Sequence, residues 1–309
     1  MKLLSFDGEA GVRRVGVLHG EAVVDVSDLV ATMPIVTERS GMFSARGIET
    51  ATGGLMRWLQ AGPQARAAAA ESIGKRLAQG PQHGAKALGS LVLRAPLARP
   101  GKIVAVGRNY ADHAKETGVK PFEKPRIIFK LPSSIADPGA TVARPALVQK
   151  FDFEGELAVV IGEFASNVAV DEALRHVAGY TVLNDLSARE FQFDINPAQT
   201  TFAKSMDGFC PLGPWLVTAD EIPDPQQLRL RTWVNEVLVQ QASTADMLFT
   251  VAVLVSYVSQ FMTLEPGDVL ATGTPAGIGA FRTPPQWLQP GDRIRIDISG
   301  IGALETTIG

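Results

Sequence analysis

The stretch FDFEGELAVVIG, residues 151–162, carries the strongest structural signal in the chain. Its second half, 157–161, is an apolar run of the length that a buried β-strand needs. Its first half places three acids at alternate positions, namely Asp152, Glu154 and Glu156. Because the side chains of a strand alternate between its two faces, we expect these acids to share one face and the aromatic residues to take the other.

Three carboxylates on one face of a strand that enters the interior need a physical explanation. Neighbouring carboxylates on that face would lie about 6–7 Å apart, and in a low-dielectric setting they would repel each other or take up protons. One interpretation is a solvated edge strand with its acids turned outward. The other is a site for a hard divalent cation, which prefers carboxylate oxygens. The local pattern leaves both open.

Length and composition restrict the class of protein. The 309 residues suffice for one large domain or two ordinary ones, and a hydrophobic fraction of 46% allows a full core. The net charge is −3 and no basic stripe stands out, so nucleic acid is not expected as a partner. Cys210 is the single cysteine, which excludes a disulfide within the chain and a cysteine-rich zinc site.

The apolar segments are too short to suggest contact with a membrane. The longest run, 250–264, falls below the roughly 20 residues that span a bilayer. The apolar start of the chain is followed at once by Asp7 and Glu9, which is not typical of a signal peptide. We therefore expect a soluble cytoplasmic protein.

The pattern of predicted secondary structure changes near residue 97. Before it, short strands are predicted, followed by an alanine-rich helical stretch over 54–80 that Gly62-Pro63 interrupts. A junction containing prolines and a glycine follows at 94–103. These features predict a small N-terminal α/β domain, residues 1–97, and a second domain, residues 98–309.

Strands outnumber helices in the second part and do not alternate with them strictly, so a mixed α+β fold is predicted. Strands are expected at 102–107, 126–130, 156–162, 179–185, 213–218, 228–235, 268–273, 292–298 and 302–308. Helices are expected at 171–178 and 244–264.

Two further groups of polar residues suggest chemistry. Asp185 follows an apolar strand, where it would either cap a helix or add another oxygen ligand to the acids of the first stretch. Ligation by oxygen alone indicates magnesium, calcium or manganese rather than zinc or copper. His113 and Glu116 lie three residues apart on a predicted helical turn, so they would form either a surface contact or a pair that activates water.

Two lysines have equally open interpretations. Lys130 ends an apolar strand, and Lys204 lies in a run rich in glycine and aromatic residues. Each would be either a surface lysine with a packed stem or a group that binds a substrate carboxylate or stabilises an enolate beside a metal. Cys210 is more typical of a small buried residue than of a nucleophile.

Seven segments in order resemble the fumarylacetoacetate hydrolase family. They are GRNYADHAKE, FKLPSS, FDFEGELAVVIG, NDLSARE, KSMDGFCPLGPW, GDVLATGTPAGIG and PGDRIRIDISGIGALET. The resemblance covers roughly residues 98 to 309, and the ordered set is far more specific than any one segment. Leu131 departs from the pattern, since many members have a proline there, which weakens the case for Lys130 as a substrate ligand.

The resemblance implies a fold and a set of site residues. The fold would be a mixed β-roll of the fumarylacetoacetate hydrolase type. The implied metal ligands are Glu154, Glu156 and Asp185, with Asp152 left to a supporting or surface position. The metal would be Mg²⁺, with Mn²⁺ or Ca²⁺ as alternatives, and the protein would be a homodimer. The implied catalytic residues are His113, Glu116 and Lys204. The implied substrate contacts are Arg108, Lys130, Arg189, Gln192 and Thr274.

The resemblance also implies a reaction class. We expect a metal-dependent hydrolase that cleaves a carbon–carbon bond in a 2,4-dioxo acid, an acylpyruvate-like substrate. The alternatives are a decarboxylase, isomerase or tautomerase of 2-oxo diacids, and a protein that binds metal without catalysis. The His113–Glu116 pair favours hydrolysis, because a simple tautomerase needs no attacking water.

Overall fold

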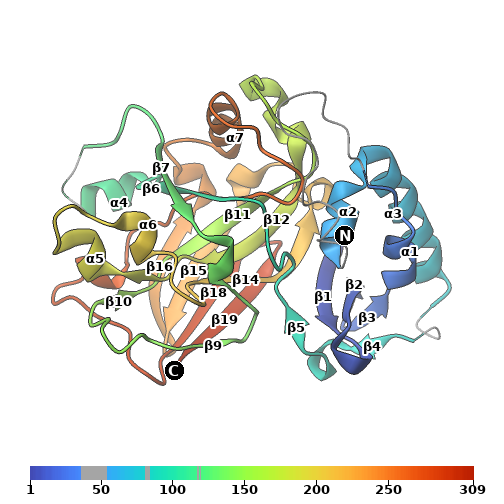
Figure 1. Cartoon of the computed structure of the whole chain (residues 1–309), viewed down its shortest axis with the longest axis horizontal. Helices are drawn as coiled ribbons and strands as arrows, with labels where there is room; N and C mark the ends of the chain where they lie inside the picture. The colour runs from blue at the N-terminus through green and yellow to red at the C-terminus, as the bar shows by residue number, and fades with distance from the viewer. Residues whose placement is uncertain (36–53, 81–83, 117, 119) are drawn as a thin grey trace.

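The computed structural model describes residues 1–35, 54–80, 84–116, 118 and 120–309. Over these residues the chain forms a mixed α+β fold in which strands predominate, which confirms the predicted fold class. In Figure 1 the N-terminal strands and helices, in blue, occupy the right side of the molecule. The remaining strands fill its centre, so one long sheet connects the two sides.

Two sheets contain most of the strands. The larger sheet is built from β1 (Lys2–Asp7), β2 (Arg13–His19), β3 (Ala22–Asp25), β4 (Lys86–Ala87), β5 (Leu93–Arg94), β6 (Ile103–Gly107), β7 (Arg126–Lys130), β8 (Ile135–Ala136), β11 (Gly155–Ile161), β12 (Val177–Asn184), β14 (Cys210–Thr218) and β17 (Val269–Ala271). Its main order is β4-β3-β2-β1-β14-β12-β11-β17-β6-β7, with β5 beside β1 and β8 beside β14.

The smaller sheet has the order β16-β15-β18-β19-β9. Its strands are β9 (Thr141–Val142), β15 (Arg229–Val234), β16 (Val237–Ser243), β18 (Arg293–Ile298) and β19 (Gly302–Ile308). A separate short ladder joins β10 (Phe151–Asp152) to β13 (Ser187–Ala188). The helices are α1 (Ser27–Ala31), α2 (Leu55–Gln60), α3 (Gly62–Ala78), α4 (Ala111–Glu116), α5 (Arg189–Phe193), α6 (Thr200–Ala203) and α7 (Val251–Ser259).

Strand β11 explains why the apolar half of the first stretch enters the interior. All of its residues are buried. Leu157, Val159 and Ile161 pack into a core shared with α7 and the smaller sheet. Ala158 and Val160 pack into a second core that includes α2 and α3. The sheet is therefore covered on both faces here, and a strand buried on both faces needs a continuous apolar run rather than an alternating one.

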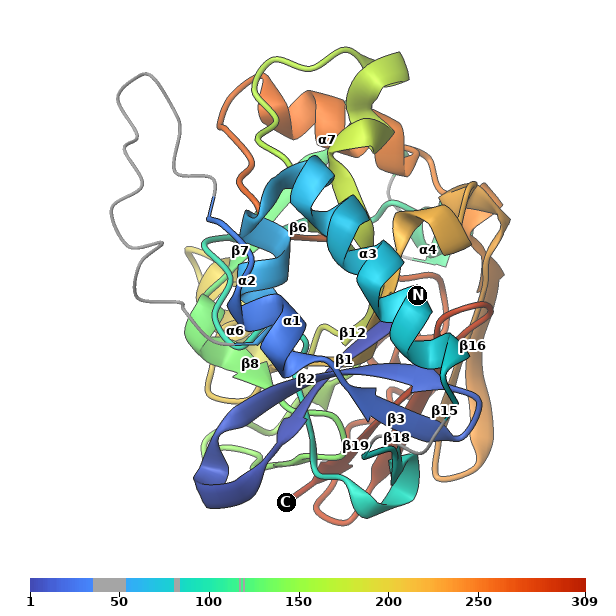
Figure 2. The same ribbon diagram turned by 90° about the vertical axis from the view of Figure 1, so that its right-hand side faces the viewer.

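The N-terminal strands extend the larger sheet. β1 pairs with β14 in antiparallel register, with Lys2 opposite Val217. Figure 2 shows α1, α2 and α3 stacked against the N-terminal strands on one face. The α2–α3 interruption at Ala61 confirms the break predicted near Gly62-Pro63. The boundary predicted at residue 97 falls between β5 and β6 and stays a prediction.

The predicted helix over 244–264 is wrong at both ends, since α7 covers only Val251–Ser259. The segment before α7 pairs with a distant part of the chain instead, because the Leu248 N–H donates to the Asn109 carbonyl at 2.7 Å. The Thr250 side chain then caps α7 by accepting from the Val253 N–H.

The other predicted helix, 171–178, is confirmed over most of its length but ends two residues early. Residues 170–176 form a 3₁₀ helix. The last two predicted positions belong instead to β12, which pairs with β11 and β14 in the large sheet. In the described part of the chain, no helix has the length and apolar character to cross a membrane.

Candidate active site

The main-chain pairing of two neighbouring strands brings the acids together. The first stretch forms two strands rather than one, since β10 ends at Asp152 and β11 begins at Gly155. Gly155 pairs with Asn184 at the end of β12. One step beyond that pair, the Asp185 N–H donates to the Glu154 carbonyl at 2.8 Å. This register places Asp185 beside the two glutamates that flank Gly155.

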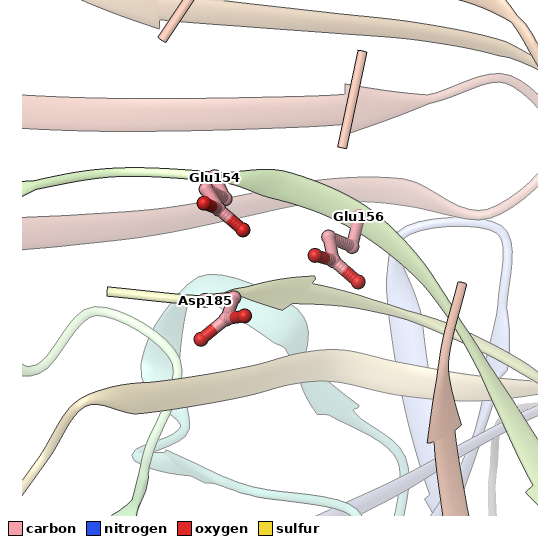
Figure 3. Close-up of side chains that lie close together, drawn as sticks. All are labelled: Glu154, Glu156 and Asp185. Carbon is pink, nitrogen blue, oxygen red and sulfur yellow. The ribbon is translucent and has the colours of Figure 1, made fainter. Parts of the chain in front are cut away.

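Glu154, Glu156 and Asp185 form a compact carboxylate group. One oxygen from each lies within 4.8 Å of the others, and all three residues are buried. Figure 3 shows the three carboxylates turned toward a common space. The interpretation as a solvated edge strand is therefore wrong. Oxygen ligands at this spacing suit a hard divalent cation.

Glu156 is the carboxylate that most needs such a cation. It accepts a hydrogen bond from the Gly273 N–H at 2.8 Å. In the described residues no lysine, arginine or histidine nitrogen lies within 4.0 Å of it. Burial, followed by the charges of Asp185 and Glu154, raises the pKa of Glu156 well above its ordinary value. An added divalent charge would relieve this cost, so the residues fit a metal.

Lys204 and Lys130 neutralise the other two carboxylates. The Lys204 ammonium lies 3.0 Å from Glu154 Oε2 and 2.6 Å from Asp185 Oδ2. The Lys130 ammonium lies 2.7 Å from Asp185 Oδ1 and also donates to the Lys204 carbonyl. Both lysines are buried, so the interpretation as surface lysines is wrong for each. Burial would lower the pKa of Lys204, but Asp185 and Glu154 outweigh it and raise that pKa.

Arg189 provides a third buried cation. Its Nη2 donates to Glu154 Oε1 at 2.6 Å and its Nη1 donates to Gln192 Oε1 at 2.8 Å. Burial would raise the pKa of Glu154, but Lys204 and Arg189 outweigh it and hold that pKa below its ordinary value. Glu154 is therefore ionised and tightly held before any metal binds.

Asp152 lies beside the carboxylate group rather than in it, in the supporting one of the two positions predicted for it. It is fully buried and accepts from Arg189 Nε at 2.8 Å. The N–H groups of Gly279 and Ala280 also donate to it, at 2.8 and 3.1 Å. Arg189 thus bridges Asp152 and Glu154, so Asp152 positions Arg189.

His113 and Glu116 lie on α4, at the edge of the carboxylate group. The His113 Nδ1 lies 2.9 Å from Glu116 Oε2, and Glu116 Oε1 accepts from the Gly277 N–H at 3.0 Å. The Phe281 ring packs edge-on against the imidazole, with centroids 5.9 Å apart. His113 is buried rather than part of a surface contact. A carboxylate at Nδ1 selects the tautomer with its proton there, which leaves the Nε2 lone pair free to accept a proton.

A single cleft joins these residues. It is lined by His113, Glu154, Asp185, Lys204, Arg108, Arg189, Gln192, Thr274, Arg126, Phe193 and Phe281, among others. The Thr274 hydroxyl makes its hydrogen bonds within the protein, since it donates to the Gly155 carbonyl at 3.1 Å and accepts from Gln240. The predicted positions thus converge on one place in the fold.

Gln240 supports the site and has no recognisable signal in the sequence. Its side-chain oxygen accepts from the Gly155 N–H at 3.1 Å, and its amide nitrogen donates to Thr274 Oγ1 at 2.7 Å. It is the one buried residue of β16, whose other residues are partly or fully exposed. Only the packing of the smaller sheet under the carboxylate group shows its role.

Gly155 separates the two glutamates and packs against the smaller sheet. A Cβ at this position would lie 2.4 Å from Thr232 Oγ1. Gly155→Ala should therefore lower the free energy of unfolding by about 1–3 kcal/mol through overpacking. Chemical denaturation measures this. The matched control is Gly74→Ala on α3, where nothing lies within 4 Å of the added carbon, and there we expect a gain of about 0.5–1 kcal/mol. Equal effects of both substitutions would contradict the packing argument.

The sequence profile described as Fumarylacetoacetate (FAA) hydrolase C-terminal matches residues 102–309. The chain belongs to the fumarylacetoacetate hydrolase family. The match includes every residue assigned above to the carboxylate group and to the His113–Glu116 pair. The N-terminal strands and helices lie outside it.

Three relatives show the range of activities in this family. The chain is 44% identical over 219 residues to the oxaloacetate tautomerase fahd2, mitochondrial, of Xenopus laevis, covering 71% of this chain and 69% of that one. It is 41% identical over 213 residues to the 4-hydroxyphenylacetate degradation bifunctional isomerase/decarboxylase of Salmonella dublin, covering 69% of this chain and 48% of that one.

The third relative is a solved structure, maleylpyruvate hydrolase from Sphingobium sp. SYK-6 in complex with manganese (II) ion and pyruvate. It is 30% identical and superimposes with a TM-score of 0.75, covering 100% of this chain and 98% of that one. Family membership therefore indicates an enzyme that acts on a small molecule, and hydrolase, isomerase, tautomerase and decarboxylase activities all occur among its relatives.

Cys210 takes no part in this site as a nucleophile. It is fully buried in β14. Burial is the largest cause that raises the pKa of its thiol to about 12. The thiolate is therefore negligible near neutral pH, which confirms the prediction of a small packed residue.

Proposed function

We propose that the protein is a divalent-metal-dependent hydrolase that cleaves a carbon–carbon bond in a 2,4-dioxo acid. One observation carries this proposal. The His113 imidazole is held at Nδ1 by a carboxylate, and it faces the same cleft as the buried carboxylate group. A base at one side of a cleft and a candidate metal group at the other are what the activation of water against a polarised carbonyl requires.

Glu154, Glu156 and Asp185 would hold the metal, for which we propose Mg²⁺ with Mn²⁺ or Ca²⁺ as alternatives. When bound, the cation would act as a Lewis acid toward the 2-oxo and carboxylate oxygens of the substrate. A metal is supported by the charge balance, because four buried carboxylates, counting Asp152, face the three buried cations Lys130, Lys204 and Arg189.

His113 would remove a proton from water at Nε2 while Glu116 stabilises the resulting imidazolium. The oxygen of that water would bond to the C4 carbonyl carbon, and the C3–C4 bond would then break. The electron pair of that bond goes to C3, which takes up a proton, so the products are pyruvate and a carboxylic acid. Lys204, 3.0 Å from Glu154, would stabilise the negative charge that develops on the pyruvate part.

The remaining predicted contacts have supporting roles in this proposal. Arg189 and Gln192 are hydrogen-bonded to each other at the edge of the cleft, where they would orient the substrate. Thr274 shapes the floor of the cleft through its bond to Gly155. Lys130, whose ammonium contacts Asp185, would hold that ligand in place rather than reach the substrate.

The second candidate is a tautomerase, isomerase or decarboxylase of a 2-oxo diacid. The name of the Xenopus relative supports it. These reactions need the carboxylate group and Lys204 but no attacking water. The two candidates therefore differ in whether the His113–Glu116 pair is essential.

A panel of substrates tests the proposal. The metal-loaded protein should release pyruvate from acylpyruvates such as acetylpyruvate, and chelation should abolish the release. A coupled lactate dehydrogenase assay measures pyruvate, and enol absorbance measures tautomerisation of oxaloacetate. Rapid turnover of oxaloacetate with no cleavage of any acylpyruvate would favour the second candidate. The homodimer and the cytoplasmic location stay predictions.

A further inference from the structure

One segment of the chain, residues 273–281, contacts both halves of the candidate site. At its start, the Gly273 N–H donates to Glu156 at 2.8 Å. Further along, the Gly277 N–H donates to Glu116 Oε1 at 3.0 Å. The position of this segment therefore affects a candidate metal ligand at one end and the acid of the histidine–glutamate pair at another point.

Two side chains bind the segment at different points. Gln240 donates to Thr274 Oγ1 at 2.7 Å and to the Pro275 carbonyl at 2.9 Å. Arg282 donates through Nε to the Gly277 carbonyl at 3.2 Å. Gln240 thus holds the end of the segment next to the carboxylate group, and Arg282 holds the part that contacts α4.

Arg282 uses its charge on main-chain oxygens rather than on acids. Its Nη2 donates to the Val239 carbonyl on β16 at 3.1 Å, so one guanidinium joins that strand to Gly277. Its Nη1 lies 3.4 Å from Gln286 Oε1. Among the residues that the structure describes, no carboxylate oxygen lies within 4.0 Å of its nitrogens. A hydrogen bond from a charged donor is stronger than one between neutral groups, so both carbonyls are held firmly.

Gly277 depends on such a contact for its orientation. Its φ is 106°, in the region that favours glycine, and a Cβ there would lie 2.0 Å from the Val239 carbonyl oxygen. Only glycine allows this close approach of the segment to β16, and glycine is also the residue with the least restricted backbone. The bridge from Arg282 to the carbonyls of Gly277 and Val239 restrains the direction of the Gly277 N–H group.

Glu116 transmits this restraint to the histidine. Its Oε1 accepts from Gly277 and its Oε2 lies 2.9 Å from His113 Nδ1, so the two contacts together set the rotation of the carboxylate. If the Gly277 N–H moved, Glu116 would lose a partner that keeps Oε2 against the imidazole.

We propose that Arg282 is a positioning residue for the His113–Glu116 pair and acts through Gly277. Arg282 is not among the residues that line the cleft, so its effect is on the orientation of the pair rather than on the binding of substrate. The inference rests on the proposed function only for its effect on cleavage. The contacts from Arg282 to His113 are the same whichever reaction the protein catalyses.

Kinetics and metal binding test this proposal together. Arg282→Met should lower kcat for cleavage of acetylpyruvate about 10–100-fold, because a misaligned base loses much of its effect. KM and the affinity for Mg²⁺, measured by titration calorimetry, should stay the same because Gln240 still holds the segment beside the carboxylate group. Arg282→Lys keeps one charged donor and should restore part of kcat. Arg144→Met is the matched control, since Arg144 also contacts a glutamine, Gln289, but does not line the cleft.

Nuclear magnetic resonance provides a readout that needs no substrate. The proton between His113 Nδ1 and Glu116 should exchange with water at least about tenfold faster in Arg282→Met than in the unaltered protein. Its resonance is identified by its absence in His113→Ala. An unchanged exchange rate would overturn the proposal, as would a full kcat or a loss of Mg²⁺ affinity as large as the loss of kcat. If the protein cleaves no acylpyruvate, the proposed hydrolase is rejected, and the exchange rate alone decides the role of Arg282.

Discussion

Glu154→Ala, Glu156→Ala and Asp185→Ala should each leave the purified protein with little bound divalent metal. One oxygen from each of the three residues lies within 4.8 Å of the others, so each substitution removes one of three candidate ligands. The loss of affinity should exceed the roughly 10–100-fold that substitution of an outer-shell partner costs. Elemental analysis and calorimetric titration with Mg²⁺ and Mn²⁺ measure this loss.

Glu71→Ala is the matched control for removal of an acid. Glu71 lies on α3 and pairs with Lys75 at the surface, with 70% of its side chain exposed. Its substitution should leave the metal content unchanged. If the three site variants retain as much metal as this control, the metal binds elsewhere in the protein.

The stability of the metal-free variants provides a second readout. Glu154→Ala should lower the free energy of unfolding by about 1–3 kcal/mol, because Lys204 and Arg189 each lose one of their two buried carboxylate partners. Glu156 has a raised pKa in the folded protein, so this carboxyl lowers the free energy of unfolding progressively as the pH rises from its ordinary pKa to the raised one, and the cost stays constant above that. Glu156→Gln removes this cost and should stabilise the metal-free protein at neutral pH. Chemical denaturation in the presence of a chelator measures the free energy of unfolding of Glu154→Ala and Glu156→Gln.

His113→Ala should reduce acylpyruvate cleavage by about 10²–10⁴-fold, the usual contribution of a general base. The imidazole lies 2.9 Å from Glu116 and is not one of the candidate ligands, so metal content should stay the same. Exchange of the C3 hydrogens of the substrate for deuterium needs no attacking water. It should persist in the variant, and nuclear magnetic resonance detects it.

The control for this substitution is His19→Ala, because His19 is exposed at the end of β2. Glu116→Gln is a milder variant, since an amide can still contact the imidazole but does not stabilise its charged form. We expect its cleavage rate to lie between those of His113→Ala and the unaltered protein. Cleavage by His113→Ala at a rate near that of the unaltered protein would exclude the pair from the mechanism and favour the tautomerase or decarboxylase.

The parts of the site that local sequence predicts are those within one element. His113 and Glu116 are three residues apart on one helix, so their contact follows from helical geometry alone. The apolar run of β11 likewise predicts a buried strand without knowledge of its partners. The order of seven segments then identifies the family and, through it, the ligand set.

Local sequence does not predict which cations neutralise the carboxylates, because this depends on which distant helices and strands lie side by side in the fold. Glu154 and Asp185 contact Lys204, and Asp185 also contacts Lys130, across separations of 19 to 55 residues. No local pattern distinguishes these buried lysines from surface ones, since a lysine has the same stem in both settings. Burial and pairing appear only when the sheet assembles.

The role of Asp152 depends on the tertiary structure for a related reason. The sequence places it in line with Glu154 and Glu156, but only the position of Arg189, 37 residues away, shows that Asp152 contacts this cation and lies outside the carboxylate group. The sequence alone therefore establishes the family, the candidate ligands and the His–Glu pair. Only the tertiary structure assigns partners to the charges, because a buried charge is stabilised by the groups around it in space rather than by its neighbours in the chain.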